Sequence, residues 1–158
     1  MTESVVQDQR RSVVRVAAYN YLRSMGEMAR SMNHGDVIEL IVFTGVWTIN
    51  TQQLIGDPTR FAELKNIPPD SMRSAATLDE VQRLTAVPPD ILATYIERLL
   101  EMNLVEQAPG GGYIVPGAVF AKPEMLDGAN EVYTAMLGLV TSLRSVGFAL
   151  GEEPAVKA

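Results

Sequence analysis

Apolar residues recur at steps of three and four positions near both ends of the chain, which is the spacing of one face of an α-helix. The first stripe is Val14, Ala18, Tyr21, Met25, Met28 and Met32, and the second is Val132, Met136, Leu139, Leu143, Val146 and Leu150. The pattern predicts long helices over residues 10–32 and 127–150, the second with Asp127 as its N-cap. A helix that buries one stripe needs a partner helix. We therefore expect a homodimer built from these terminal helices, with pairing inside one chain as the alternative.

Residues 37–54 form the most apolar segment, with apolar side chains on nearly every side of a helix. Such a helix belongs in the middle of a fold, so we expect Trp47 to lie in the core. Asp36 and Glu39 have the spacing of a capping pair at the start of this helix. The apolar run over residues 37–49 is interrupted by Glu39 and is shorter than the roughly 20 residues that cross a bilayer. We therefore expect no membrane partner.

Residues 77–102 contain the signals of two consecutive helices. Thr77 and Glu80 match a T-x-x-E capping box, and the short helix after them should turn Leu78, Val81 and Leu84 inward. Pro88 and Pro89 suit the first turn of a second helix, which should end near Met102, where Asn103 can adopt the left-handed conformation. The inner face of this second helix is expected to be Leu92, Ile96 and Leu99.

A β-hairpin is predicted directly after these helices. Residues 104–107 and 113–115 have the composition of short strands, and the sequence APGGG between them supplies a flexible turn. Residues 74–76 are candidates for a third, very short strand. The preceding segment, residues 56–76, is rich in proline and is expected to be a loop with at most one short helix around residues 61–65.

The order of helix, turn, helix, strand, glycine-rich turn and strand resembles the MarR-like winged helix-turn-helix regulators of bacteria. The residues that carry this resemblance are LDEVQRLTAVPPDILATYIERLLEMNLVEQ followed by GGGYIVP, about a quarter of the chain. The sequence INTQQLIGDP is more weakly similar to uncharacterised proteobacterial winged-helix proteins.

The resemblance implies a mainly α, winged helix-turn-helix fold with long N- and C-terminal dimerisation helices and a small β-wing. We expect one domain over residues 1–150 and a disordered tail over residues 151–158. By resemblance, residues 89–102 are the recognition helix that enters the DNA major groove, and residues 108–113 are the wing. The resemblance also implies a small-molecule effector pocket near Trp47.

The outer face of the recognition helix is poor in groups that bind DNA. The candidate DNA-binding residues are Arg73, Asp90, Thr94, Tyr95, Arg98, Gly111 and Gly112. Of the helix positions, only Thr94 and Arg98 are obvious donors to phosphates or bases. Residues 77–115 contain two arginines against six carboxylates, and the whole chain has a net charge of −6. The leading hypothesis is a DNA-binding transcription regulator, and the alternative is a winged-helix module that has lost DNA binding and contacts a protein partner.

Composition argues against enzymatic chemistry. The chain contains no cysteine and a single histidine, His34, and no base is spaced to activate a nucleophile. We therefore expect neither catalysis, nor a cofactor, nor a metal site. The N-terminal sequence lacks the pattern of a signal peptide, and a chain without cysteine suits a reducing compartment. Both observations favour the cytoplasm.

Overall fold

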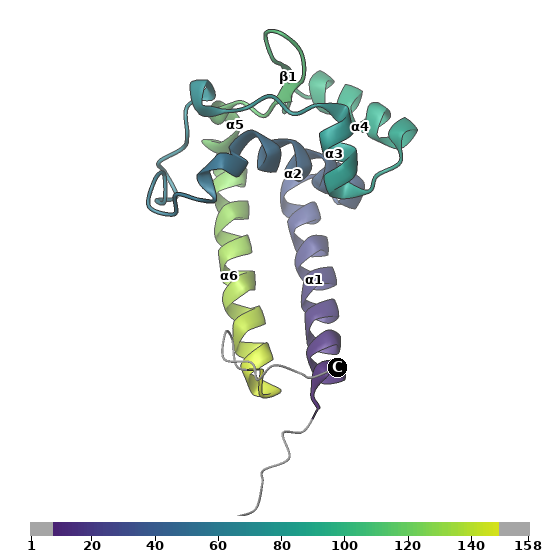
Figure 1. The fold of residues 1–158 in the computed structure, drawn as a ribbon, viewed down its shortest axis with the longest axis vertical. Helices are drawn as coiled ribbons and strands as arrows, with labels where there is room; N and C mark the ends of the chain where they lie inside the picture. The colour runs from purple at the N-terminus through teal and green to yellow at the C-terminus, as the bar shows by residue number, and fades with distance from the viewer. Residues whose placement is uncertain (1–7, 149–158) are drawn as a thin grey trace, which may run out of the picture.

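The computed structural model describes residues 8–148, which form a mainly helical protein with one small antiparallel sheet. Two long helices, α1 (Arg10–Met32) and α6 (Pro123–Ser145), run antiparallel and side by side, and we call this pair the stalk (Figure 1). The remaining elements gather at one end of the stalk and form the head. Leu150 and the tail over residues 151–158 lie outside the described residues.

The head contains four helices and one hairpin. Its helices are α2 (Val37–Thr51), α3 (Leu78–Thr85), α4 (Pro89–Glu101) and α5 (Gly117–Phe120). The hairpin consists of β1 (Glu106–Gln107) and β2 (Tyr113–Ile114), and short 3₁₀ turns, η1 (Gln52–Leu54) and η2 (Asp70–Met72), lie on either side of the long loop. The expected short helix around residues 61–65 does not form, and η2 follows further along the chain.

Helix α2 lies in the middle of the head, as its apolar circumference predicts. It packs against α1, α3, α4 and β2, and Val42, Phe43 and Val46 are fully buried in the core. Asp36 caps the helix by accepting the backbone N–H of Glu39 at 3.0 Å. The helix ends at Thr51 and continues as η1. No helix within residues 8–148 has both the length and the hydropathy that crossing a bilayer requires.

Helices α3 and α4 pack on α2 through faces that the sequence largely predicts. The capping box forms, with the Thr77 hydroxyl and the Glu80 carboxylate each bonded to the other's backbone N–H. The predicted inner face of α4, Leu92, Ile96 and Leu99, is buried.

The prediction for α3 is partly wrong, because Val81 is buried whereas Leu78 and Leu84 are exposed. This short helix meets α2 at a close crossing over Gly45. A Cβ atom at Gly45 would lie 2.8 Å from the Thr85 methyl group and 3.3 Å from Val81. Such a crossing buries one turn of α3 and leaves its flanks in solvent.

The hairpin is fixed at its base by a third segment. Strands β1 and β2 pair antiparallel, and Ala76 forms a two-bond bridge with Tyr113. The Asn50 side chain joins α2 to this sheet: its amide donates to the carbonyls of Ser74 and Tyr113, and its oxygen accepts the N–H of Val115 at 2.9 Å. The third strand is therefore a single bridging residue, and one buried amide connects it to both the helix and the hairpin.

The stalk differs from the predicted pairing in two ways. Helix α6 begins at Pro123 and not at Asp127, because proline starts a helix well and adds a full turn that packs below α5. Asn20 and Ser24 are buried, and they are one turn apart on α1, so a polar strip of this helix is covered in the stalk.

Part of the predicted apolar stripe of α1 therefore does not face α6. Val14 and Tyr21 are exposed, and the neighbouring Leu22 is 74% exposed. On α6, Tyr133 is 65% exposed and Leu137 is exposed as well. Val14 and Tyr21 are seven residues apart and so lie on the same side of α1. Pairing inside the chain thus leaves an apolar side of α1 unburied.

Candidate functional site

The outward face of α4 is acidic. Asp90, Thr94, Glu97 and Glu101 are all exposed on it, together with the apolar side chain of Ile91. The Thr94 hydroxyl donates to the carbonyl oxygen of Asp90 at 3.0 Å, one helical turn earlier. Thr94 can therefore still accept a hydrogen bond from a ligand, but its own proton is already engaged.

Tyr95 and Arg98 lie on the side of α4 that faces the start of α2, where they meet two carboxylates. The Tyr95 hydroxyl donates to Oδ2 of Asp36 at 2.8 Å, and Nη1 of Arg98 donates to the same oxygen at 3.2 Å. The Nε atom of Arg98 lies 3.1 Å from Oε1 of Glu39, at an angle outside hydrogen-bond geometry, so this contact is an ion pair. The one basic residue of α4 is thus engaged within the chain.

Glu39 is the buried centre of this cluster, with a side chain that is 0% exposed. Its Oε2 atom accepts a hydrogen bond from the amide of Asn33 at 3.0 Å, and the exposed ring of His34 lies 3.6 Å away. A buried carboxylate requires such partners, because losing its hydration is costly. Arg98, although partly exposed, therefore neutralises the buried negative charge of Glu39.

Asp36 and Tyr95 have shifted pKa values that reflect their shared hydrogen bond. Burial alone would raise the pKa of Asp36, but the Glu39 backbone N–H, the Tyr95 hydroxyl and the charge of Arg98 together lower it. The hydrogen bond to Asp36 raises the pKa of Tyr95, and burial adds to that rise. At neutral pH the cluster thus holds a charged carboxylate and a protonated phenol.

Arg73 is separate from the α4 face. Its side chain is only 1% exposed and its guanidinium lies over the ring of Phe120, 5.0 Å from the ring centre. Nη2 donates to the carbonyl oxygen of Pro68 at 3.0 Å, and Nε lies 3.6 Å from Asp70. Burial lowers the pKa of Arg73, and the negative charge of Asp70 opposes that shift. The arrangement shows no surface on which Arg73 could meet a DNA backbone.

The two glycines expected in the wing differ in their surroundings. Gly111 is exposed, and a Cβ atom there would meet nothing within 4 Å. A Cβ atom at Gly112 would lie 3.0 Å from the carbonyl oxygen of Ala76, and its φ of 77° lies in the left-handed region. Gly112 therefore permits the close approach of β2 to the bridging segment, while Gly111 belongs to the free turn.

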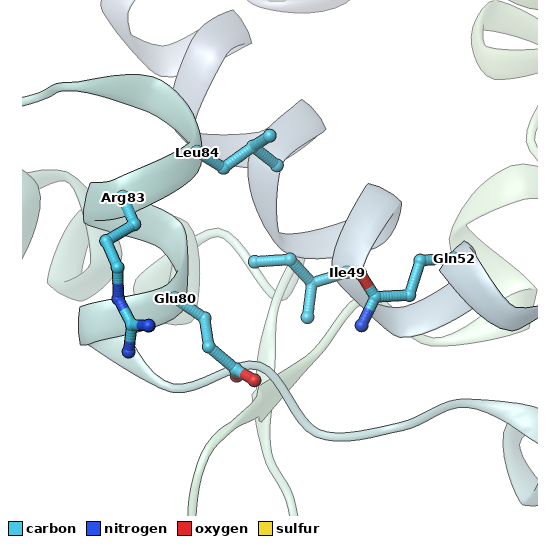
Figure 2. A pocket seen from close by; sticks show the side chains of 5 residues that line it. All are labelled: Ile49, Gln52, Glu80, Arg83 and Leu84. Atoms are coloured by element: carbon cyan, nitrogen blue, oxygen red, sulfur yellow. The ribbon is translucent and has the colours of Figure 1, made fainter.

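A shallow groove of about 320 Å³ lies between α3 and the C-terminal end of α2. In Figure 2, Glu80 extends from α3 toward Ile49 and Gln52, and Arg83 runs along the other side of α3. The Glu80 carboxylate is already used in the capping box, which lowers its pKa through the Thr77 backbone N–H and hydroxyl. Since both charged groups belong to exposed turns of α3, the groove offers no buried polar group for a ligand.

Sequence reasoning missed the pairing of α4 with the start of α2. It placed Asp36 and Glu39 only at a helix N-terminus and turned Tyr95 and Arg98 to solvent. The sequence shows that Asp36 and Glu39 are three residues apart, as are Tyr95 and Arg98. It does not show that the first two contact the second two, because that depends on how α2 and α4 cross. Within the described part of the chain no group of three histidine, cysteine or carboxylate side chains is placed to hold a metal ion.

Comparison with known proteins adds no further assignment. The chain matches no protein-family model, and neither a curated protein nor a solved structure matches it.

Proposed function

We propose that this chain is a winged-helix transcription regulator that binds DNA as a homodimer, in the manner that its resemblance to MarR-like regulators implies. The observation that carries the proposal is the arrangement of the head. Helices α3 and α4 are braced on α2, and a hairpin with a free glycine turn follows α4 at once. This arrangement leaves the outer face of α4 and the hairpin turn exposed together.

The proposed DNA contact depends on Arg98, the only cation on α4. In the free protein Asp36 and Glu39 hold it, so DNA must compete with two carboxylates for the guanidinium. Phosphate neutralisation supplies much of the affinity in most DNA complexes. We therefore expect weak binding with a shallow salt dependence, detectable at low salt with fragments selected from a random genomic library.

Asp36→Asn tests this competition directly. Asparagine caps a helix about as well as aspartate, so α2 should remain intact while Arg98 loses one anionic partner. We expect DNA affinity to rise about threefold to tenfold, since one charge-assisted contact is worth about 1 kcal/mol or more at a partly exposed site. Fluorescence anisotropy at fixed low salt measures the change.

The matched control is Asp36→Asn in an Arg98→Ala background, where no gain is expected because the freed cation is missing. An equal gain in both backgrounds would show that only the total charge matters. Absence of any binding at micromolar protein and low salt would contradict the DNA-binding proposal itself.

The exposed apolar side of α1 that holds Val14 and Tyr21 supports the homodimer. Soluble monomers seldom leave a large apolar surface in water, and two stalks joined along this side would make a four-helix bundle. We expect Val14→Glu combined with Tyr21→Glu to weaken self-association at least tenfold, because charged side chains would enter the apolar contact. Sedimentation equilibrium of wild type and variant measures it.

Arg30→Glu serves as the control for the stalk, since Arg30 is exposed on α1 but lies off the apolar stripe. This variant should associate like the wild type. A wild-type chain that sediments as a monomer at tens of micromolar would remove the dimer from the proposal.

A second candidate function is favoured by the charge of the α4 face. Asp90, Glu97 and Glu101 are exposed on the same helix as the exposed Ile91, and such a surface suits a protein partner that offers basic and apolar side chains better than it suits DNA. Glu97→Lys with Glu101→Lys separates the two functions. It should strengthen DNA binding if the chain reads DNA, and leave the chain without DNA affinity if the face binds protein.

A further inference from the structure

Two exposed helix faces, one on α4 and one on the N-terminal half of α1, carry opposite charges with the same spacing. The first is a stripe at steps of four, three and four residues: Asp90, Thr94, Glu97 and Glu101. The second is a stripe at the same steps: Arg11, Arg15, Ala18 and Leu22. Side chains at these steps lie on one side of a helix, so each stripe forms a continuous surface.

Each stripe contains two like charges one turn apart. We call Arg11 and Arg15 the basic pair, and Glu97 and Glu101 the acidic pair. Like charges at this spacing destabilise a helix, and the helix dipole also disfavours a cation such as Arg11 in a first turn. Within residues 8–148 neither pair has an opposite charge at ion-pair distance, because the nearby Arg98 is engaged by carboxylates of α2. Each pair therefore lacks the charge that the other pair offers.

The two stripes cannot meet within one chain. Figure 1 places α4 in the head and the start of α1 at the far end of the stalk. The 23 residues of α1 rise about 35 Å between these ends. The stripe on α1 also lies about a quarter turn away from Val14 and Tyr21, so it stays accessible when that apolar side is covered. A contact between the stripes therefore requires a second copy of the chain.

We propose that α4 of one copy packs antiparallel against the N-terminal half of α1 of a second copy. The identical steps then set the basic pair against the acidic pair. They also bring the exposed Leu22 to the end of α4 that holds the exposed Ile91. A parallel direction would instead set the acidic pair against Ala18 and Leu22. The contact covers the face of α4 that is proposed to meet DNA, but it does not depend on that proposal.

A second copy suits the basic pair better than other anionic partners do. Recognition of an anionic membrane usually takes about four to eight basic residues, and a DNA backbone is likewise held by several cations. The stripe on α1 offers two arginines, and the acidic pair matches them in number, charge and spacing. Exposed ion pairs are individually weak, so the contact forms at high protein concentration and depends on salt.

Exchanging the charges tests the contact. Glu97→Lys with Glu101→Lys makes both stripes basic, and Arg11→Glu with Arg15→Glu makes both acidic. Each double variant should weaken salt-sensitive self-association at least about fivefold. The chain with all four substitutions regains opposite charges and should return to within about twofold of the wild type. Sedimentation equilibrium of the full chain at about 0.01 M and about 0.15 M salt measures the effect, since the Debye length falls from about 30 Å to about 8 Å.

The controls separate this contact from net charge and from the apolar dimer. The two double variants shift the net charge in opposite directions, so a loss in both cannot come from net charge. Arg30→Glu with Asp127→Lys exchanges two exposed charges outside the stripes and should behave like the wild type. The apolar contact at Val14 and Tyr21 does not weaken as salt rises, so its failure differs from the failure of this contact.

The proposal is wrong if the wild type shows no salt-sensitive self-association at about 0.5 mM protein, where contacts of millimolar affinity are detectable. It is also wrong if the chain with all four substitutions associates as weakly as the double variants. Binding of the wild type, but not of Arg11→Glu with Arg15→Glu, to phosphatidylserine vesicles without such self-association would assign the basic pair to lipid.

Discussion

Asn50→Ala is expected to lower the free energy of unfolding by about 3 kcal/mol, since each buried group left without a partner costs about 1–3 kcal/mol. The Asn50 side chain is fully buried and makes three hydrogen bonds that alanine cannot replace. The carbonyls of Ser74 and Tyr113 would lose a donor and the N–H of Val115 would lose an acceptor. Urea unfolding followed by circular dichroism measures the loss.

Asn50→Asp separates hydrogen bonding from packing. Aspartate keeps the volume and can still accept from Val115, but it points a carboxylate oxygen at two carbonyls, so we expect a loss at least as large as for alanine. Asn130→Ala, at an exposed position of α6, should change stability by less than about 0.5 kcal/mol. An Asn50→Ala variant as stable as this control would show that the three bonds contribute nothing net.

Arg98→Met is expected to cost about 2 kcal/mol of stability. Glu39 would remain buried without its ion-pair partner, with the hydrogen bond from Asn33 and the longer contact to exposed His34 as its other polar contacts. Breaking a fully buried ion pair from one side costs about 3–5 kcal/mol, and the 45% exposure of the Arg98 side chain reduces that figure because water screens the pair. Tyr95 would also lose the cation that shares Asp36 with it.

The double variant Glu39→Gln with Arg98→Met should recover more than half of that loss, because a neutral amide needs no cation. Arg83→Met, which removes an exposed arginine from α3, should stay within about 0.5 kcal/mol of the wild type. Equal losses in Arg98→Met and in the double variant would mean that Arg98 acts through packing of its stem and not through the buried charge.

The sequence predicts well those parts of the fold that depend on residues close together in the chain. The capping box of Thr77 and Glu80, the buried face of α4 and the left-handed Asn103 all follow from local spacing, and the structure contains each of them. A capping box needs only two residues of one helix turn, and the inner face of an amphipathic helix needs only its period.

The parts that sequence misses depend on how elements cross. The crossing of α2 and α4 brings Asp36 to Tyr95 and Arg98, and that distance is not encoded in the period of either helix. The same holds for Arg73, which looks like a free cation before α3 but has its guanidinium stacked over the ring of Phe120. Leu78 and Leu84 are exposed, although their spacing predicts an inner position, because α3 crosses α2 closely at Gly45 through Val81 and Thr85.

The candidate DNA-binding residues also fall into two groups, those whose surroundings follow from local spacing and those whose surroundings depend on how elements cross. Asp90, Thr94 and Gly111 are exposed positions, as helix period and turn composition predict. Tyr95, Arg98 and Arg73 each contact a segment distant in the sequence. Gly112 lies close to the bridging segment at Ala76. A cavity beside Trp47 lies between segments that are far apart in the sequence, so the residues that form it have no shared pattern along the chain.

The tethered base of the hairpin limits the entropy that a binding partner must overcome. Ala76 and Asn50 hold β2 in place, whereas the turn over residues 109–111 is exposed and Gly110 and Gly111 have open space around them. Ordering a residue costs about 1–2 kcal/mol of conformational free energy. A partner that binds the turn therefore has only these few residues to immobilise, because the strands on either side of the turn are already ordered by folding.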